Sequence, residues 1–169
     1  NYFEELEKQG TAYLYEAKLL LIGEGGVGKT SLATKLLDKT AELWNNSALF
    51  YKWQDGFKKI ELISGTANTK GAVSNILLHD KRKIELKETI ISIDMPLEKT
   101  AVYEHIHMTN TQITRFNAID EFTTEYTSEV EYTKLNGLLI KLMSKLFPGK
   151  FKAQSLKWMK QFKEFAEQK

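Results

Sequence analysis

The chain has 169 residues, of which 42% are hydrophobic and 11% aromatic, enough for the core of one mid-sized domain. Its formal net charge of +2 gives no electrostatic reason to expect nucleic acid or an acidic membrane as a partner. The absence of cysteine excludes disulfides and thiolate metal sites and fits a reducing cytoplasm. The longest apolar run, Leu19 to Ile22, is too short for a membrane span, so we expect a soluble cytoplasmic protein.

A phosphate-binding loop is the most specific motif near the N-terminus. The segment Glu16–Ile22 is short and almost wholly apolar, which is typical of a buried strand. The eight residues that follow, Gly23 to Thr30 (GEGGVGKT), match the pattern G-x-x-x-x-G-K-[ST] completely, and residues 31–39 are expected to form a helix. Glycines let backbone N–H groups surround phosphate oxygens, and the helix directs its positive end at the same anion. The motif therefore predicts phosphate binding between this strand and this helix.

Residues 1–37 (NYFEELEKQGTAYLYEAKLLLIGEGGVGKTSLATKLL) resemble the start of a Roc domain, a Ras-like GTPase module. The resemblance implies binding of GTP or another nucleotide with Mg²⁺, with Thr30 as the Mg²⁺ ligand. The residues implied in phosphate binding are Gly23, Gly25, Gly26, Gly28, Lys29, Thr30 and Ser31. The rest of the GTPase pattern is missing, because Leu97 stands where the D-x-x-G motif after Asp94 needs glycine, and Asn136 replaces the aspartate of the guanine-reading motif. We therefore expect a truncated GTPase start that binds nucleotide weakly, whatever its base, with negligible hydrolysis.

The middle of the chain predicts one antiparallel sheet. Six segments alternate with period two and are separated by turn-forming residues: Phe57–Ser64, Val73–Asp80, Lys83–Asp94, Thr100–Met108, Thr111–Ala118 and Glu121–Tyr132. The alternation is clearest in the last segment, where Phe122, Tyr126 and Tyr132 share one face and glutamates occupy the other. After the break at Pro148-Gly149, residues 150–167 have an aromatic stripe at helical spacing. The pattern predicts an α+β fold in which this helix crosses the concave face of the sheet.

Residues 38–169 resemble the START-like polyketide cyclase superfamily, abbreviated SRPBCC. The most distinctive matches are the Trp-x-x-Gly turn at Trp53 to Gly56 and the Phe-Pro-Gly entry into the last helix. The resemblance implies a helix-grip fold, in which a curved antiparallel sheet wraps a long C-terminal helix around a deep apolar cavity. The family begins with a strand that leads into its first helix. In this chain, either Glu16–Ile22 supplies that strand or the sheet lacks an edge. We therefore expect a Roc-like segment at residues 1–37 and a helix-grip domain at residues 38–169.

Five aromatic residues are the candidates for lining the cavity: Tyr103, Tyr126, Tyr132, Trp158 and Phe162. A tyrosine can line an apolar pocket and still offer one hydrogen bond, and the tryptophan and phenylalanine would form the helix side or fill the space completely. We expect His105 and His107 on a wet face, with Ile106 and Met108 inward, because no nucleophile or carboxylate pair accompanies the histidines.

Two functions of different classes follow. The first is a non-catalytic binding module that holds a hydrophobic small molecule or lipid between the sheet and the last helix. The alternative is a P-loop nucleotide-binding protein with weak or no GTPase activity. If the chain is an enzyme, we expect a P-loop GTPase or a polyketide cyclase-like activity, and a fold with no retained activity is the third possibility. The longer resemblance favours the first function, and no residue is assigned a catalytic role.

Overall fold

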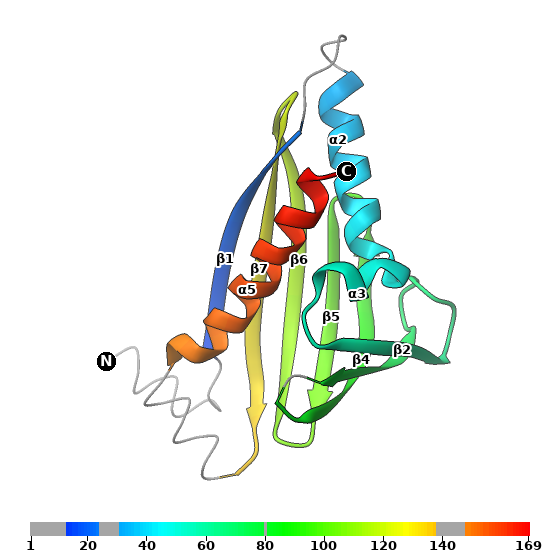
Figure 1. The fold of residues 1–169 in the computed structure, drawn as a ribbon. Coiled ribbons are helices and arrows are strands. Elements are labelled where there is room, and N and C mark those ends of the chain that lie inside the picture. The colour runs from blue at the N-terminus through cyan, green and yellow to red at the C-terminus, as the bar shows by residue number, and fades with distance from the viewer. Residues whose placement is uncertain (1–12, 24–30, 80, 138–147) are drawn as a thin grey trace.

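The computed structural model describes residues 13–23, 31–79, 81–137 and 148–169 (Figure 1). Within these ranges the strands form one antiparallel sheet with the order β1-β7-β6-β5-β4-β3-β2. The strands are β1 (Tyr13–Ile22), β2 (Phe57–Ser64), β3 (Val73–His79), β4 (Lys83–Asp94), β5 (Glu98–His105), β6 (Met108–Asp120) and β7 (Thr123–Leu135). The helices are α2 (Ser31–Asn45), η1 (Ser47–Leu49), α3 (Phe50–Trp53) and α5 (Pro148–Glu167). The predicted α+β helix-grip fold is confirmed, since α5 lies across the concave face of this sheet (Figure 1).

β1 supplies the strand whose presence the sequence left open. It pairs antiparallel with β7, from Tyr13 opposite Tyr132 to Ile22 opposite Thr123. Ala17 and Leu21 face the core and are 7% and 2% exposed, and Leu19 on the same face of the strand packs against this core, whereas Lys18 and Leu20 point outward. The helix α2 then runs without a break across residues 37 and 38. The predicted division of the chain at that point stays a prediction, but β1 forms an edge of the same sheet as the six strands that follow.

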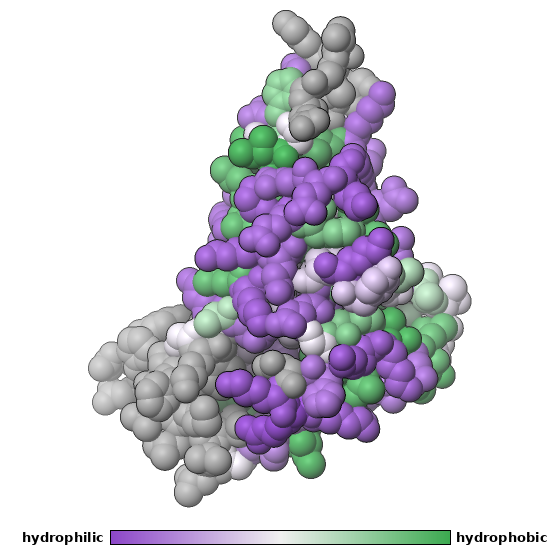
Figure 2. Space-filling view, viewed as in Figure 1, coloured by the Kyte–Doolittle hydropathy of each residue, from purple (hydrophilic) through white to green (hydrophobic). Residues whose placement is uncertain are grey.

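The helix α5 packs through one stripe of side chains. Met159, Phe162 and Phe165 are 2%, 0% and 9% exposed, at the helical spacing that the sequence indicated. Proline is the first residue of the helix, a position where its missing N–H costs nothing. The outward face of α5 is hydrophilic, and hydrophobic side chains lie beside it near the upper end of β1 (Figure 2), where Leu20 and Ile22 are exposed.

Side chains of α5 also cover part of the open edge of β1. Among the described strands β1 is an edge strand, so its backbone groups that point away from β7 have no neighbouring strand there. The Nζ of Lys163 donates to the carbonyl of Leu20 at 2.7 Å, and Oε1 of Glu167 accepts from the N–H of Ile22 at 2.8 Å. These two side chains also form an ion pair with each other one helical turn apart. Two edge groups of β1 are thereby satisfied by the last turns of α5.

Two expected side-chain orientations are wrong, and both errors lie at turns. Phe122 was expected to face inward with Tyr126, but it lies in the β6–β7 turn and is 39% exposed. Its N–H donates to Oδ1 of Asp120 at 2.8 Å, which fixes the turn and takes Phe122 out of the strand alternation. Ile106 was expected to face inward and is 75% exposed, because the β5–β6 turn interrupts the strand there.

Candidate functional site

An aromatic cluster fills the space between α5 and the strands β6 and β7. Tyr126 and Phe162 are 3% and 0% exposed, and their ring centroids are 5.7 Å apart. Phe116 stacks on Tyr126 at 5.0 Å, and Trp53 lies 5.1 Å from Phe162. Nε1 of Trp44 donates to the hydroxyl of Tyr126 at 3.0 Å, and burial raises the pKa of that phenol. Two of the five candidate cavity residues are therefore core residues, and a role for them as ligand contacts stays a prediction.

The other three candidates lie farther along the concave side of the sheet or at the margin of the cluster. Tyr132 is 9% exposed and belongs to a second, smaller cluster with Val130. Trp158 is half-buried and packs against the margin of the aromatic cluster, where its Nε1 donates to the carbonyl of Asp55 at 3.2 Å. Tyr103 is half-buried on β5. The structure thus brings Tyr126 and Phe162 into contact and distributes the remaining three around them.

A charged group lies beside Tyr103 on the concave face of β4 and β5. The side chains of Lys99 and Glu88 are only 6% and 8% exposed, and Nζ lies 3.5 Å from Oε2. The hydroxyl of Tyr103 donates to the same Oε2 at 2.6 Å. Burial and the Glu88 charge hold the pKa of the Tyr103 phenol well above its usual value, so this phenol remains a proton donor. We call these three residues, Lys99, Glu88 and Tyr103, the Lys99 cluster.

Strand geometry explains how the Lys99 cluster forms. Lys99, Ala101 and Tyr103 share the concave face of β5, and Glu88 is directly opposite Tyr103 on β4. The small side chain of Ala101 leaves room for Lys99 to extend along the strand toward Glu88. Nζ of Lys99 also lies 5.8 Å from the centre of the Trp44 ring, within the range of a cation–π contact.

Lys99 and Glu88 were not predicted as site residues, although the sequence contains a signal for each of them. The predicted strand began at Thr100, one residue too late to include Lys99 in the alternation with Tyr103. Glu88 lies between Leu86 and Ile90 on the inward-facing positions of a period-two pattern. A carboxylate at such a position is expected to have a hydrogen-bonding or charged partner, because burying it alone is costly. Burying an ion pair seldom adds stability, so the pair between Lys99 and Glu88 is not what holds β4 and β5 together.

A separate hollow lies between the end of β1, α2 and the last turn of α5. Its volume is about 500 Å³, within the range of small-molecule sites. Its apolar wall consists of Leu21, Leu36, Leu43 and Ala166 together with Ile22. Its polar residues are Lys35, Lys39, Thr40, Glu121, Glu167, Gln168 and Lys169. We call this space the end hollow, and none of the five candidate aromatic residues is among its lining residues.

The predicted phosphate loop begins at the end hollow. Gly23 lines the hollow, its N–H donates to the carbonyl of Phe122 at 2.7 Å, and a Cβ atom there would lie 2.9 Å from a methyl group of Leu36. Ser31 is the first residue of α2. The remaining residues assigned to the loop, Gly25, Gly26, Gly28, Lys29 and Thr30, lie outside the described residues. Phosphate and Mg²⁺ binding therefore stay predictions.

The histidines are the remaining polar candidates. Among the described residues, no group of three or more His, Cys, Asp or Glu side chains is placed to hold a metal ion. His105 and His107 are neighbours, with ring centroids 5.4 Å apart. The pKa of His105 is lowered mainly by burial and to a smaller extent by the charge of His107. Within the same described ranges, no helix is long and apolar enough to cross a membrane.

Comparison with known proteins defines the class of fold. No protein-family model matches the chain, and no curated protein matches it either. Among solved structures, Ara h 8.0201 is similar over 94% of this chain and 99% of its own, with a TM-score of 0.67 and 14% identity. The Zhui aromatase/cyclase from Streptomyces sp. R1128 has a TM-score of 0.68 and 10% identity, over 92% of this chain and 94% of its own.

Norcoclaurine synthase from Thalictrum flavum is a third similar structure, with a TM-score of 0.62 and 12% identity, over 92% of this chain and 93% of its own. The same enzyme has also been solved in complex with dopamine and hydroxybenzaldehyde. These likenesses define a helix-grip fold for this chain. At identities this low they carry the fold alone, and the Roc-like resemblance of residues 1–37 stays a prediction.

Proposed function

We propose that the protein binds a hydrophobic small molecule or lipid, without catalysis, between the sheet and the C-terminal helix. The observation that carries this proposal is the end hollow, because it combines a volume of about 500 Å³ with walls from β1, α2 and α5. The helix-grip neighbours support the proposal in general terms, since one of them holds small aromatic molecules.

The chemistry of the end hollow suits an amphiphile. Leu21 is 2% exposed at its floor, and half-buried Leu36 and Leu43 form its α2 side. An apolar group bound there would leave water and gain roughly 25 cal/mol for each Å² of apolar surface buried. Exposed Lys35 and Lys39 at the rim would remain accessible to a polar or anionic end of the ligand.

Fluorescence of anilinonaphthalene sulfonate, an anionic amphiphile, tests the proposal. We expect saturable binding to the native protein, with an unchanged near-ultraviolet circular dichroism spectrum to exclude a loosened core. Ala166→Phe places a ring in the end hollow and should weaken binding at least about tenfold, the effect of losing roughly 1.4 kcal/mol. The matched control is Ala153→Phe, on an exposed position of α5 away from the hollow, which should bind as the wild type does. No saturable binding, or equal binding by both variants, would contradict the proposal.

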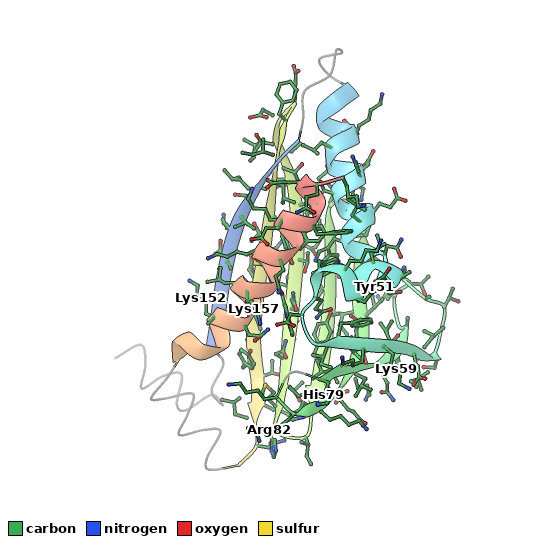
Figure 3. All side chains as sticks on the ribbon, viewed as in Figure 1. Tyr51, Lys59, His79, Arg82, Lys152 and Lys157 are labelled. Carbon is green, nitrogen blue, oxygen red and sulfur yellow. The ribbon has the colours of Figure 1, made fainter. Side chains whose placement is uncertain are left out.

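A second candidate function is weak binding of nucleotide phosphates by the loop from Gly23 to Thr30. The order of elements favours it, because β1 ends at Ile22 and α2 begins at Ser31, and a phosphate loop requires a strand before it and a helix after it. In calorimetry with Mg²⁺, we expect GTP and ATP to bind weakly and about equally. Lys29→Ala should abolish the signal, whereas Lys152→Ala, on the exposed side of α5 (Figure 3), should preserve it. Tight binding of GTP with exclusion of ATP would indicate a working GTPase site instead.

A further inference from the structure

The ammonium group of Lys99 has more donors than the described residues satisfy. It carries three N–H donors, and its closest carboxylate oxygen, Oε2 of Glu88, is 3.5 Å away. That oxygen already accepts the Tyr103 hydroxyl at 2.6 Å. Within the described part of the chain, the other contact of the ammonium is the ring of Trp44, and a ring face accepts no full hydrogen bond. Because the side chain is only 6% exposed while its ammonium keeps donors that Glu88 and Trp44 do not use, the Lys99 cluster is suited to donate to an oxygen of a ligand.

The concave face beside the Lys99 cluster is accessible. Tyr103, Asn110 and Gln112 are each half-buried, so their side chains are not sealed in the core. Asn110 is opposite Tyr103 on the neighbouring strand. Nε2 of Gln112 donates to Oγ of Ser128 at 3.1 Å, so this part of the face is lined by polar groups with assigned partners. A ligand could approach Lys99 along this face.

The Lys99 cluster is separate from the end hollow. In the strand register, Lys99 is level with Thr114 and Ser128, whereas the end hollow begins where Ile22 pairs with Thr123. Tyr126 of the aromatic cluster lies between these two levels. An inference about the Lys99 cluster therefore concerns a second site, which can be tested independently of the first.

The charges of the cluster select the class of ligand. Lys99 is already balanced by Glu88, so a carboxylate or phosphate would bring a second negative charge into a poorly solvated site beside that glutamate. A carbonyl oxygen offers an acceptor to the ammonium without adding a charge. We infer that the Lys99 cluster is a second binding site, which takes an uncharged ligand through a carbonyl oxygen that accepts from Lys99.

The test uses 6-propionyl-2-dimethylaminonaphthalene, an uncharged fluorescent ketone. The informative variant combines Lys99→Met with Glu88→Gln, because removing both charges leaves no unpaired buried ion and the amide can still accept from Tyr103. Loss of a hydrogen bond to a charged group should weaken binding of the ketone by about tenfold or more. The matched control combines Lys87→Met with Glu104→Gln, an exposed pair 2.6 Å apart on the opposite face of the same two strands. The control should bind the ketone as the wild type does.

Three outcomes would overturn the inference: no binding of the ketone to the wild type, equal affinity of the wild type and the Lys99–Glu88 double variant, or tighter binding of naphthoate than of the ketone. Anilinonaphthalene sulfonate binding, measured on the same proteins, reports on the end hollow and should be unchanged in the double variant. If that binding fails while the ketone result holds, the proposed function at the end hollow falls and the Lys99 site stands. If the ketone result fails alone, the reverse holds.

Discussion

Truncation of Phe162 should show how strongly α5 is anchored to the sheet. The side chain is 0% exposed and lies between Trp53 and Tyr126, with ring centroids 5.1 and 5.7 Å away. Phe162→Ala removes a buried ring and leaves a cavity whose rigid aromatic walls cannot easily collapse, and such changes cost about 3–5 kcal/mol. We expect a loss of about 4 kcal/mol in the free energy of unfolding, a large part of the roughly 5–15 kcal/mol typical of a domain.

Urea unfolding followed by tryptophan fluorescence and far-ultraviolet circular dichroism measures this loss. At about 2–4 °C per kcal/mol for a chain of this size, the melting temperature should fall by about 8–16 °C. The control is Phe122→Ala, because that ring is 39% exposed in the β6–β7 turn and its backbone hydrogen bonds would remain. The control should stay within about 0.5 kcal/mol of the wild type. A loss below about 1 kcal/mol for Phe162→Ala would refute the packing of α5 described above.

Three smaller changes test individual contacts. Lys157 on α5 (Figure 3) lowers the pKa of Asp55 by a hydrogen bond and by its charge. The contact therefore stabilises the fold at a pH above the ordinary pKa of an aspartate, and this stabilisation is lost as the pH falls through the lowered pKa of Asp55. In Lys157→Met, the Asp55 pKa should rise toward its usual value in a carbon-13 NMR titration, and an unchanged pKa would show that the pair does not persist in solution. Gly23→Ala should lower the free energy of unfolding by no more than about 1 kcal/mol, because the Leu36 methyl groups can move away from the new Cβ atom and because alanine reduces the conformational entropy of the unfolded chain. A larger loss in urea unfolding would show that the contact with Leu36 is rigid. Trp158→Ala should cost about 1–3 kcal/mol, since its half-buried ring loses less than a core aromatic, and a melting temperature equal to that of wild type would remove Trp158 from the packing.

The fold could be predicted largely because one face of the sheet is wet. In β7 the glutamates alternate with Tyr126, Ser128 and Val130, and only one assignment of faces puts the charges in water. The aromatic stripe of α5 then needs a partner, and the concave face is the apolar surface available. The alternation of polar and apolar residues was therefore enough to predict the architecture. It placed Phe122 on the inward face by mistake, because Phe122 lies in a turn stabilised by Asp120, where side chains do not alternate as they do in a strand.

The candidate site could be predicted less well, because it depends on tertiary register. The pairing of β4 with β5 shifts between Ile90 and Ser92, and an irregularity of this kind leaves no periodic trace in the sequence. That irregularity lies between Glu88 and the residue opposite Lys99, so the contact between these two side chains could not be inferred from spacing. Tyr103 was identified because aromatic residues on an inward face are expected near a cavity. Its charged neighbours Lys99 and Glu88 were not identified, because lysine and glutamate are the residue types expected on a solvent-exposed surface.

The contacts between β1 and α5 have a consequence for the order in which the chain assembles. β1 is synthesised before its pairing partner β7 and before Lys163 and Glu167, whose side chains cover its edge, and the other strands lie between them in the sequence. Closing so long a loop is slow, because its entropy is lost before the contacts form. Until then, the apolar run from Leu19 to Ile22 is an unpaired strand that can associate with another chain. Folding yield should therefore fall with protein concentration, and a variant whose last helix is removed should aggregate during refolding while its remaining strands retain the sequence needed to pair.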